Sequence, residues 1–322
     1  MINNIGPYSN SNLLYNIGAK KTPQKKTAEI QAPQANEQKP ATKPIDVDIF
    51  YIADIHGKMT NMERIGAMSK HFDAQKTNGA KLKLASGDIL LGSNSKTNQV
   101  ASNFLNWVGV TANALGNHEL DATPSAFAET IKDAKYQLLA INTEVDPKSP
   151  MFGKIKPSII EEHNGEKFGI IGAAPPDAFK RVGTRESLQD IKIDDFDTTV
   201  KKIQQEVNRL SEQGINKIII LSHLGKDLDK RLAKETEGID IILGGHTHDL
   251  YKGVKEKENL VYSKNGEPVI LTQIGKDGEF VGMLKASFDE SGVLKKIQNN
   301  VGRSGLFNSC LLYTSPSPRD MR

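Results

Sequence analysis

The chain has 322 residues, of which 37% are hydrophobic and 25% charged, and this ordinary globular composition excludes collagen-like, mucin-like and wholly disordered proteins. Its net charge of +3 comes from the ends: residues 1–44 contribute +4 and residues 304–322 contribute +1, which leaves −2 for residues 45–303 and no basic surface that would bind a nucleic-acid polymer. The only cysteine is Cys310, so disulfides and cysteine-ligated zinc are also excluded.

The N-terminal segment is rich in Asn, Gln, Lys, Thr and Pro. A segment of this kind buries too little apolar surface to offset the entropy lost on ordering, so we expect a disordered polar arm over residues 1–44. Its apolar cluster, Leu13-Leu14-Tyr15, is shorter than the core of a signal peptide. No stretch of the chain approaches the ~20 apolar residues of a membrane-spanning helix. We therefore expect no membrane span and, by default, a cytoplasmic location.

Residues 45–303 alternate strand-like apolar runs with helical patterns. The helical pattern is clearest near residue 200, where Val200, Ile203 and Val207 recur at the spacing of one helix face. We predict strands over residues 47–53, 81–86, 136–142, 167–173, 216–221 and 239–243, helices over residues 61–72, 97–107 and 196–213, and closing antiparallel strands over residues 268–274 and 280–288. The alternation predicts a single layered α/β domain over this region.

The chain ends in a segment that looks foreign to what precedes it. The string SCLLYTSPSPRD, residues 309–320, resembles translated adaptor sequence from the ends of assembled reads. We therefore expect residues 304–322 to be a non-native tail outside the fold.

Five short polar blocks follow apolar strand-like runs, and they hold five of the seven histidines of the chain. They are Asp54-Ile55-His56-Gly57, Gly87-Asp88, Gly116-Asn117-His118-Glu119, Ser222-His223 and Gly244-Gly245-His246-Thr247-His248. Because the loops at the carboxyl ends of parallel strands converge on one crevice, these blocks predict a composite metal site. Each block alone is also consistent with an ordinary turn, cap or strand end, and it is their joint occurrence that favours metal binding.

Taken in order, the five blocks resemble the calcineurin-like metallophosphoesterases. Three longer strings resemble the bacterial 5′-nucleotidase and UDP-sugar hydrolase branch of that family: GNHELD over residues 116–121, SHLG over residues 222–225 and GIDIILGGHTH over residues 238–248. The resemblance covers about residues 47–290 and implies an α-β-β-α sandwich with the metal site at the C-terminal ends of its strands. Full-length members of the branch add a C-terminal nucleotidase domain, to which nothing in this sequence corresponds, and they are often exported.

The family pattern also implies seven ligands for two divalent ions, three for each ion and one shared. They are Asp54, His56 and His248 for one ion, Asn117, His223 and His246 for the other, and Asp88 as the bridge. Carboxylate, amide and imidazole donors without thiolate suit Mn, Zn, Fe or Co. A bridging carboxylate suits two ions ~3.5–4 Å apart, which is the spacing used for in-line displacement at phosphorus.

Two further residues, His118 and Asp121, are predicted to be catalytic. His118 follows a metal ligand, and the resemblance implies that it stabilises the transition state and protonates the leaving oxygen. Asp121 would orient the imidazole ring. Alternatively, Asp121 supports the start of a helix at Thr123-Pro124.

The resemblance implies a hydrolase in which a metal-bound hydroxide cleaves the phosphomonoester of a nucleotide, as in a 5′-nucleotidase. Its partner would be a small nucleotide or other phosphoester and not a nucleic-acid polymer. Two alternatives remain open. One is a 2′,3′-cyclic-nucleotide phosphodiesterase with 3′-nucleotidase activity, and the other is a non-catalytic metal-binding regulatory module.

Overall fold

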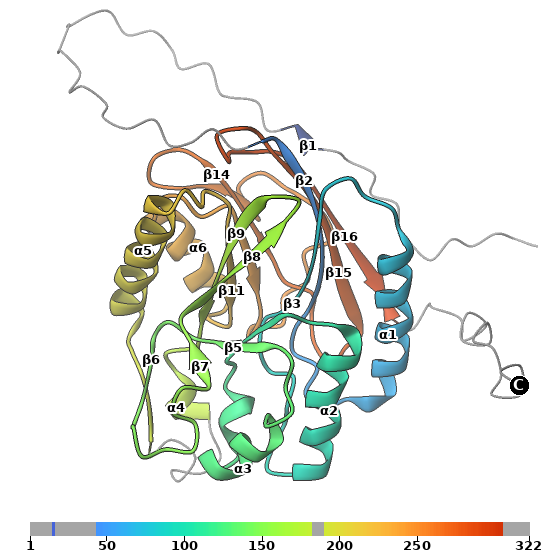
Figure 1. Cartoon of the computed structure of the whole chain (residues 1–322), viewed down its shortest axis with the longest axis vertical. Helices are drawn as coiled ribbons and strands as arrows, with labels where there is room; N and C mark the ends of the chain where they lie inside the picture. The colour runs from blue at the N-terminus through green and yellow to red at the C-terminus, as the bar shows by residue number, and fades with distance from the viewer. Residues whose placement is uncertain (1–14, 17–42, 182–189, 305–322) are drawn as a thin grey trace, which may run out of the picture.

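The computed structural model describes residues 15–16, 43–181 and 190–304. In this part of the chain two β-sheets pack face to face and helices cover their outer faces, which gives four layers (Figure 1). The layered α-β-β-α sandwich predicted from the sequence is therefore confirmed. Most of the predicted arm, residues 1–44, and of the predicted tail, residues 304–322, lies outside the described residues.

The first sheet is mixed and has the strand order β1-β16-β15-β2-β3-β4-β5-β7. Its strands are β1 (Tyr15–Asn16), β2 (Ile45–Ile52), β3 (Ala80–Ala85), β4 (Ala112–Ala114), β5 (Gln137–Leu139), β7 (Ile155–Lys156), β15 (Phe280–Phe288) and β16 (Leu294–Arg303). The strands from β2 to β7 run parallel, whereas β15 pairs antiparallel with both β2 and β16. Nearly every side chain of β2 is buried, as is typical of a parallel strand covered on both faces.

The second sheet has the strand order β13-β14-β12-β11-β9-β8. Its strands are β8 (Ser158–His163), β9 (Glu166–Ala173), β11 (Ile218–Ser222), β12 (Ile241–Gly244), β13 (Leu260–Tyr262) and β14 (Pro268–Thr272). Strands β9, β11, β12 and β14 are parallel. A two-residue turn, Asn164-Gly165, joins β8 to β9, and the positive φ of both residues, 55° and 82°, suits a tight hairpin. A separate short pair joins β6 (Thr143–Val145) to β10 (Ile191–Ile193).

Helices close the two outer faces of the sandwich. The first sheet is covered by α1 (Met59–Ala74), α2 (Ser95–Val108) and α3 (Pro124–Thr130), and the second by α5 (Phe196–Glu212) and α6 (Lys226–Glu235). Two shorter elements are η1 (His118–Asp121) and α4 (Ala178–Arg181). The largest helix, α5, begins where the side chain of Asp195 accepts a hydrogen bond from the backbone amide of Thr198. No helix in the described ranges has both the length and the apolar character needed to cross a membrane.

The sequence-based expectation did not include several strands, among them β4 and β16, and two further differences have a clear physical reason. Strand β14 lies within a segment predicted to be antiparallel, yet it pairs in parallel with β12 and antiparallel only with the short β13. A fully apolar run fits a buried strand in either direction, so its sequence does not encode the direction of its partner. Helix α6 was not predicted, because its sequence, KDLDKRLAKE, leaves only a narrow apolar stripe.

Candidate metal centre

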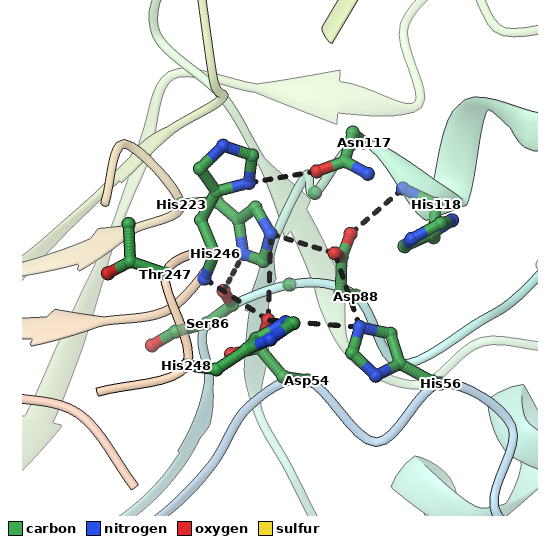
Figure 2. A network of polar contacts seen from close by, with 12 residues as sticks. Asp54, His56, Ser86, Asp88, Asn117, His118, His223, His246, Thr247 and His248 are labelled. Carbon is green, nitrogen blue, oxygen red and sulfur yellow. Dashed lines mark hydrogen bonds and ion pairs between the residues drawn. The ribbon is translucent and has the colours of Figure 1, made fainter. Parts of the chain in front are cut away.

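The five polar blocks lie together at one end of the sandwich, where parallel strands of both sheets end. Residues 54–57, 87–88 and 116–119 follow β2, β3 and β4 of the first sheet, while His223 and residues 244–248 extend β11 and β12 of the second. Figure 2 shows the side chains that point toward one another there: Asp54, His56, Asp88, Asn117, His118, His223, His246 and His248. The predicted convergence of strand ends therefore occurs across the interface of two sheets.

Asp88 lies between side chains from both sheets. Its Oδ2 lies 3.0 Å from Nε2 of His223 and 3.5 Å from Nε2 of His56. Its Oδ1 accepts a 2.8 Å hydrogen bond from the backbone amide of His118. One buried carboxylate thus reaches a ring from each sheet, which is the position that a bridging ligand requires.

Asp54 and Asn117 connect the remaining two histidines to the cluster. Oδ1 of Asp54 lies 3.4 Å from Nε2 of His248 and accepts a 3.1 Å hydrogen bond from the backbone amide of His246. Oδ1 of Asn117 lies 2.9 Å from Nδ1 of His246. Three groups of side chains have donor atoms that all lie within 4.8 Å of one another: Asp54, His56 and His248; His56, Asp88 and His118; and Asp88, His223 and His246. The structure therefore brings all seven predicted ligands together.

The backbone at this end is strained. Five of the seven predicted ligands have a positive φ: Asp54 (52°), His56 (52°), Asp88 (52°), His246 (78°) and His248 (60°). The left-handed conformation costs a residue other than glycine about 1–2 kcal/mol. Because such residues cluster where surrounding structure holds a functional site in place, their concentration here indicates that this end carries the function.

Two glycines let the loops approach one another closely. A Cβ at Gly116 would lie 2.2 Å from Oδ1 of Asp88. A Cβ at Gly245 would lie 2.8 Å from Nδ1 of His223 and 2.9 Å from Oδ2 of Asp54. Any larger residue at either position would push the ligands apart, which explains why glycine precedes Asn117 and His246 in their motifs.

Several donor atoms of the cluster are buried and yet unsatisfied by the protein. Oδ2 of Asp54, Nε2 of His56 and Nε2 of His223 have no hydrogen-bond partner within the described residues. The two imidazole nitrogens still face Oδ2 of Asp88, at 3.5 Å for His56 and 3.0 Å for His223, but without hydrogen-bond geometry. A buried polar atom without a hydrogen bond costs about 1–3 kcal/mol, so three in one cluster indicate that a ligand completes the site. The donors are oxygen and imidazole nitrogen without thiolate, and they fit divalent cations such as Mn, Zn, Fe or Co.

Crowding of charge shifts the pKa of several groups here. Burial opposes a charge on His223, but the carboxylates of Asp88 and Asp54 raise the pKa of its ring to about 10. Burial and the nearby charge of Asp88 raise the pKa of Glu119. In the protein alone, a proton on the ring of His223 thus offsets part of the charge of these carboxylates. Divalent cations at the same place would displace that proton, because ligand histidines bind metal in the neutral form.

His118 and Asp121 lie in contact at the side of the cluster. Nδ1 of His118 is 2.7 Å from Oδ2 of Asp121, and that oxygen also accepts a 2.7 Å hydrogen bond from the backbone amide of Gly92. The hydrogen bond with Asp121 raises the pKa of His118. The N-cap of α3 is Thr123, whose hydroxyl accepts a 3.3 Å hydrogen bond from the amide of Ala126. The two side chains meet as expected, and their catalytic role stays a prediction.

Glu119 holds two of the ligand loops together. Its buried carboxylate accepts hydrogen bonds of 2.9 Å from the amide of Asp88, 2.8 Å from that of Ile89 and 2.9 Å from that of Gly116. It therefore fixes the loop of Asp88 against the loop that carries Asn117.

Sequence reasoning missed two acidic residues of the cluster. Oδ1 of Asp177 lies 3.3 Å from Nε2 of His246. The other residue is Asp277. Its Oδ1 lies 3.1 Å from Nδ1 of His56, although the two residues are 221 positions apart. In the sequence it stands in an ordinary Gly-Lys-Asp-Gly turn, which predicts a loop and nothing more. Its φ of 58° is a further signal of strain, but only a structure reveals it.

Known proteins match most of this chain. A family model described as calcineurin-like phosphoesterase matches residues 47–250. The trifunctional nucleotide phosphoesterase protein YfkN of Bacillus subtilis is 29% identical over 293 residues, which cover 80% of this chain and 19% of that protein. A probable 5′-nucleotidase of Treponema pallidum is 30% identical over 257 residues, 76% of this chain and 40% of that protein. A 5′-nucleotidase precursor of Thermus thermophilus superposes with a TM-score of 0.71 at 26% identity, covering 80% of this chain and 54% of that one.

These matches differ in how much of each protein they cover. The chain spans about half, or less, of the length of these relatives. The family model, in contrast, covers well over half of this chain and includes all five polar blocks that meet at the end of the sandwich. The chain therefore belongs to the calcineurin-like phosphoesterase family.

Proposed function

We propose that this chain is a dinuclear metal-dependent phosphoesterase that hydrolyses nucleotide phosphomonoesters. The observation that carries the proposal is the cluster itself, in which two groups of ligand-type donors meet at Asp88 beside the His118–Asp121 pair. Phosphoester hydrolysis needs concentrated positive charge at the phosphoryl oxygens and an acid near the leaving oxygen, and these residues can provide both. The names of relatives, a nucleotide phosphoesterase and a 5′-nucleotidase, support nucleotides as the substrates.

Two of the three groups of donor atoms support a division of the ligands between two ions, while the third joins His118 to His56 and Asp88. The proposed sets are Asp54, His56 and His248 for one ion, Asn117, His223 and His246 for the other, and Asp88 for both. Support for a shared Asp88 comes from its Oδ2, which faces one histidine of each set. Bound divalent cations supply the positive charge that polarises a phosphoryl group and acidifies the attacking water.

His118 is proposed to act on the leaving oxygen. A carboxylate can only accept hydrogen bonds, so the contact with Asp121 places a proton on Nδ1 of His118 and leaves Nε2 as the atom that can face a substrate. The His118 side chain is 29% exposed and that of Asp121 12%, so the ring reaches solvent while its partner is largely buried. An imidazolium held in this way can donate its proton to the departing alkoxide.

The test is hydrolysis by the full chain after chelation and reconstitution with Mn²⁺. It is followed as inorganic phosphate from monoesters and as the released nucleoside monophosphate or p-nitrophenol from the other substrates. We expect metal-dependent turnover of AMP, with 3′-AMP, UDP-glucose and p-nitrophenyl phosphate as comparison substrates. The same preparation kept in chelator is the control and should be inactive.

The outcomes distinguish the alternatives. Preference for 2′,3′-cyclic AMP and bis-p-nitrophenyl phosphate over AMP would favour a cyclic phosphodiesterase that uses the same centre. Protein that binds two ions and hydrolyses none of these compounds would contradict the proposed catalysis and favour a regulatory module.

A further inference from the structure

One ring of the cluster is held from outside by a carboxylate that is not among the proposed ligands. Nδ1 of His56 lies 3.1 Å from Oδ1 of Asp277, while Nε2 of the same ring points inward, 3.5 Å from Oδ2 of Asp88. The inward nitrogen is buried and has no hydrogen-bond partner within the described residues. The two nitrogens of His56 thus face two different environments.

This contact selects the tautomer of His56. The carboxylate of Asp277 can only accept a hydrogen bond, so Nδ1 must carry the proton. In the neutral ring the lone pair then lies on Nε2 and is directed into the cluster, which is the form that a metal ligand needs. Without Asp277 the ring could place its proton on the inward nitrogen instead.

The turn that carries Asp277 is fixed against the loop that carries His56. The backbone amide of Asp277 donates a 2.6 Å hydrogen bond to the carbonyl of Asp54, and the side chain of Asn61 donates a 2.8 Å hydrogen bond to the carbonyl of Asp277. Gly278 packs closely against the side chain of Ile65, since a Cβ at position 278 would lie 3.0 Å from it. The left-handed φ of Asp277, 58°, aims its side chain in this fixed setting.

His223 offers a comparison within the same cluster. Its Nδ1 lies 2.6 Å from the backbone carbonyl of Ser86, which is also an acceptor only. Both rings therefore have an outer acceptor that sets the same tautomer, but the acceptor of His223 belongs to the backbone. The acceptor of His56 is a side chain, and substitution can remove it.

We propose that Asp277 is a positioning residue that sets the orientation and tautomer of His56 for metal binding. The inference rests on the proposed function, because it takes His56 to be a ligand. Carboxylates that hold a ligand histidine from outside typically contribute 10- to 100-fold to metal affinity or activity, by the general pattern of such sites. Asp277 should therefore strengthen the binding of one of the two ions by about 10- to 100-fold.

The experiment is calorimetric titration of the chelator-treated full chain with Mn²⁺, for the wild type and three variants. Asp277→Gly removes the carboxylate, tolerates the positive φ and keeps the backbone hydrogen bond to Asp54. Asp277→Asn retains a neutral acceptor and also tolerates this φ. Glu279→Gln is the matched control, because it removes the same charge from an exposed position of the same turn.

We expect Asp277→Gly to weaken one binding event by about 10- to 100-fold, Asp277→Asn to lie between this variant and the wild type, and Glu279→Gln to bind as the wild type does. Melting temperatures in chelator separate positioning from folding. Equal weakening of both events together with a lower melting temperature would assign Asp277 a structural role only and overturn the inference. Wild-type affinity in Asp277→Gly would overturn it while leaving the proposed function intact. A wild type that binds no Mn²⁺ would contradict both.

Discussion

The two ends of the sandwich differ in how their buried charged groups are paired. At the end where β9, β11 and β12 begin, the ammonium group of Lys217 is completely buried and has acceptors, Oε2 of Glu166 at 2.9 Å and Oδ1 of Asn216 at 3.0 Å. At the end where these strands finish, Oδ2 of Asp54 and Nε2 of His56 are buried and have no hydrogen-bond partner among the described residues. Because parallel strands of one sandwich form both ends, the difference lies in the partners of the buried charged groups and not in the architecture.

The backbone is regular at the first of these ends and strained at the second. Next to Lys217 the chain continues regular pairing, and the amide of Gly169 donates a 2.9 Å hydrogen bond to the carbonyl of Lys217. At the other end, five of the proposed ligands are left-handed. A buried charge that stabilises a fold is paired by the protein, because an unpaired one costs several kcal/mol. Unpaired donors on strained backbone therefore indicate a ligand site, whereas burial of charge alone does not.

The largest effect should come from Asp88, which we propose to be shared by both ions. Asp88→Asn keeps the shape of the side chain and removes its charge, so we expect loss of the bound metal. Activity should fall by more than ~10⁴-fold, because the charge of the ions supplies several kcal/mol of transition-state stabilisation. Metal content after dialysis and phosphate release measure the two effects. Asp133→Asn, at an exposed position after α3, is the control and should retain both; tight binding of two ions by Asp88→Asn would remove Asp88 from the ligand set.

A smaller effect, of a different kind, is expected at His118. His118→Ala should retain two ions but lose about 10²- to 10⁴-fold in rate, because it removes only proton donation and stabilisation of the transition state. The same metal analysis and rate assay apply. Loss of metal to the extent seen in Asp88→Asn would show that His118 is a ligand and that the proposed division between ligand and acid is wrong.

The metal end was largely predictable from the sequence, since its chemistry is concentrated in short motifs. Glycine next to Asp88, Asn117 and His246 and polar blocks after apolar runs indicated which residues would meet. The direction of β14 was not predictable, because a buried apolar run has the same pattern in parallel and antiparallel pairing. Nor was Asp277, since a contact across 221 positions depends on how two turns pack and leaves no periodic signal.

The opposite end was not singled out by sequence reasoning at all. Lys217 and Glu166 stand at strand starts, where charged residues are ordinarily exposed, and no motif links them. They come together because β9 and β11 are neighbouring parallel strands whose register, with Ile218 opposite Gly169, leaves the ammonium group of Lys217 within reach of Glu166. Sequence reasoning therefore identified the end that carries distinctive motifs. It did not identify the end whose residues are unusual only because they are buried.

Breaking the pair at that end should change stability and leave the metal centre alone. Lys217→Met leaves Glu166 without its main partner, so the free energy of unfolding should fall by about 3–5 kcal/mol. Replacing both residues, with Lys217→Met and Glu166→Leu, should restore most of that loss, because no charge is then left uncompensated. Urea unfolding measures both, and metal content below the transition should match the wild type. A single variant as stable as the wild type would contradict the comparison of the two ends.

The smallest expected effect is a dependence on pH that belongs to Glu166. Burial opposes its ionisation, but hydrogen bonds from Lys217 and from the backbone amide of Lys43 hold the pKa of Glu166 below its ordinary value. A carboxylate with a lowered pKa in the folded state stabilises the fold above the unfolded-state pKa of ~4.3, and this contribution is lost as the pH falls through the folded-state value. The difference in unfolding free energy between the wild type and Glu166→Gln should therefore be full at pH 7 and shrink on acidification.

The measurement is urea unfolding in chelator across this range, where carboxylates of the empty metal centre titrate in both proteins and cancel. In the Lys217→Met background the dependence should no longer have this sign, because burial without the Lys217 partner favours the protonated carboxyl group. In the wild-type background, a difference that stays constant or grows toward low pH would show that Glu166 is not held ionised by Lys217.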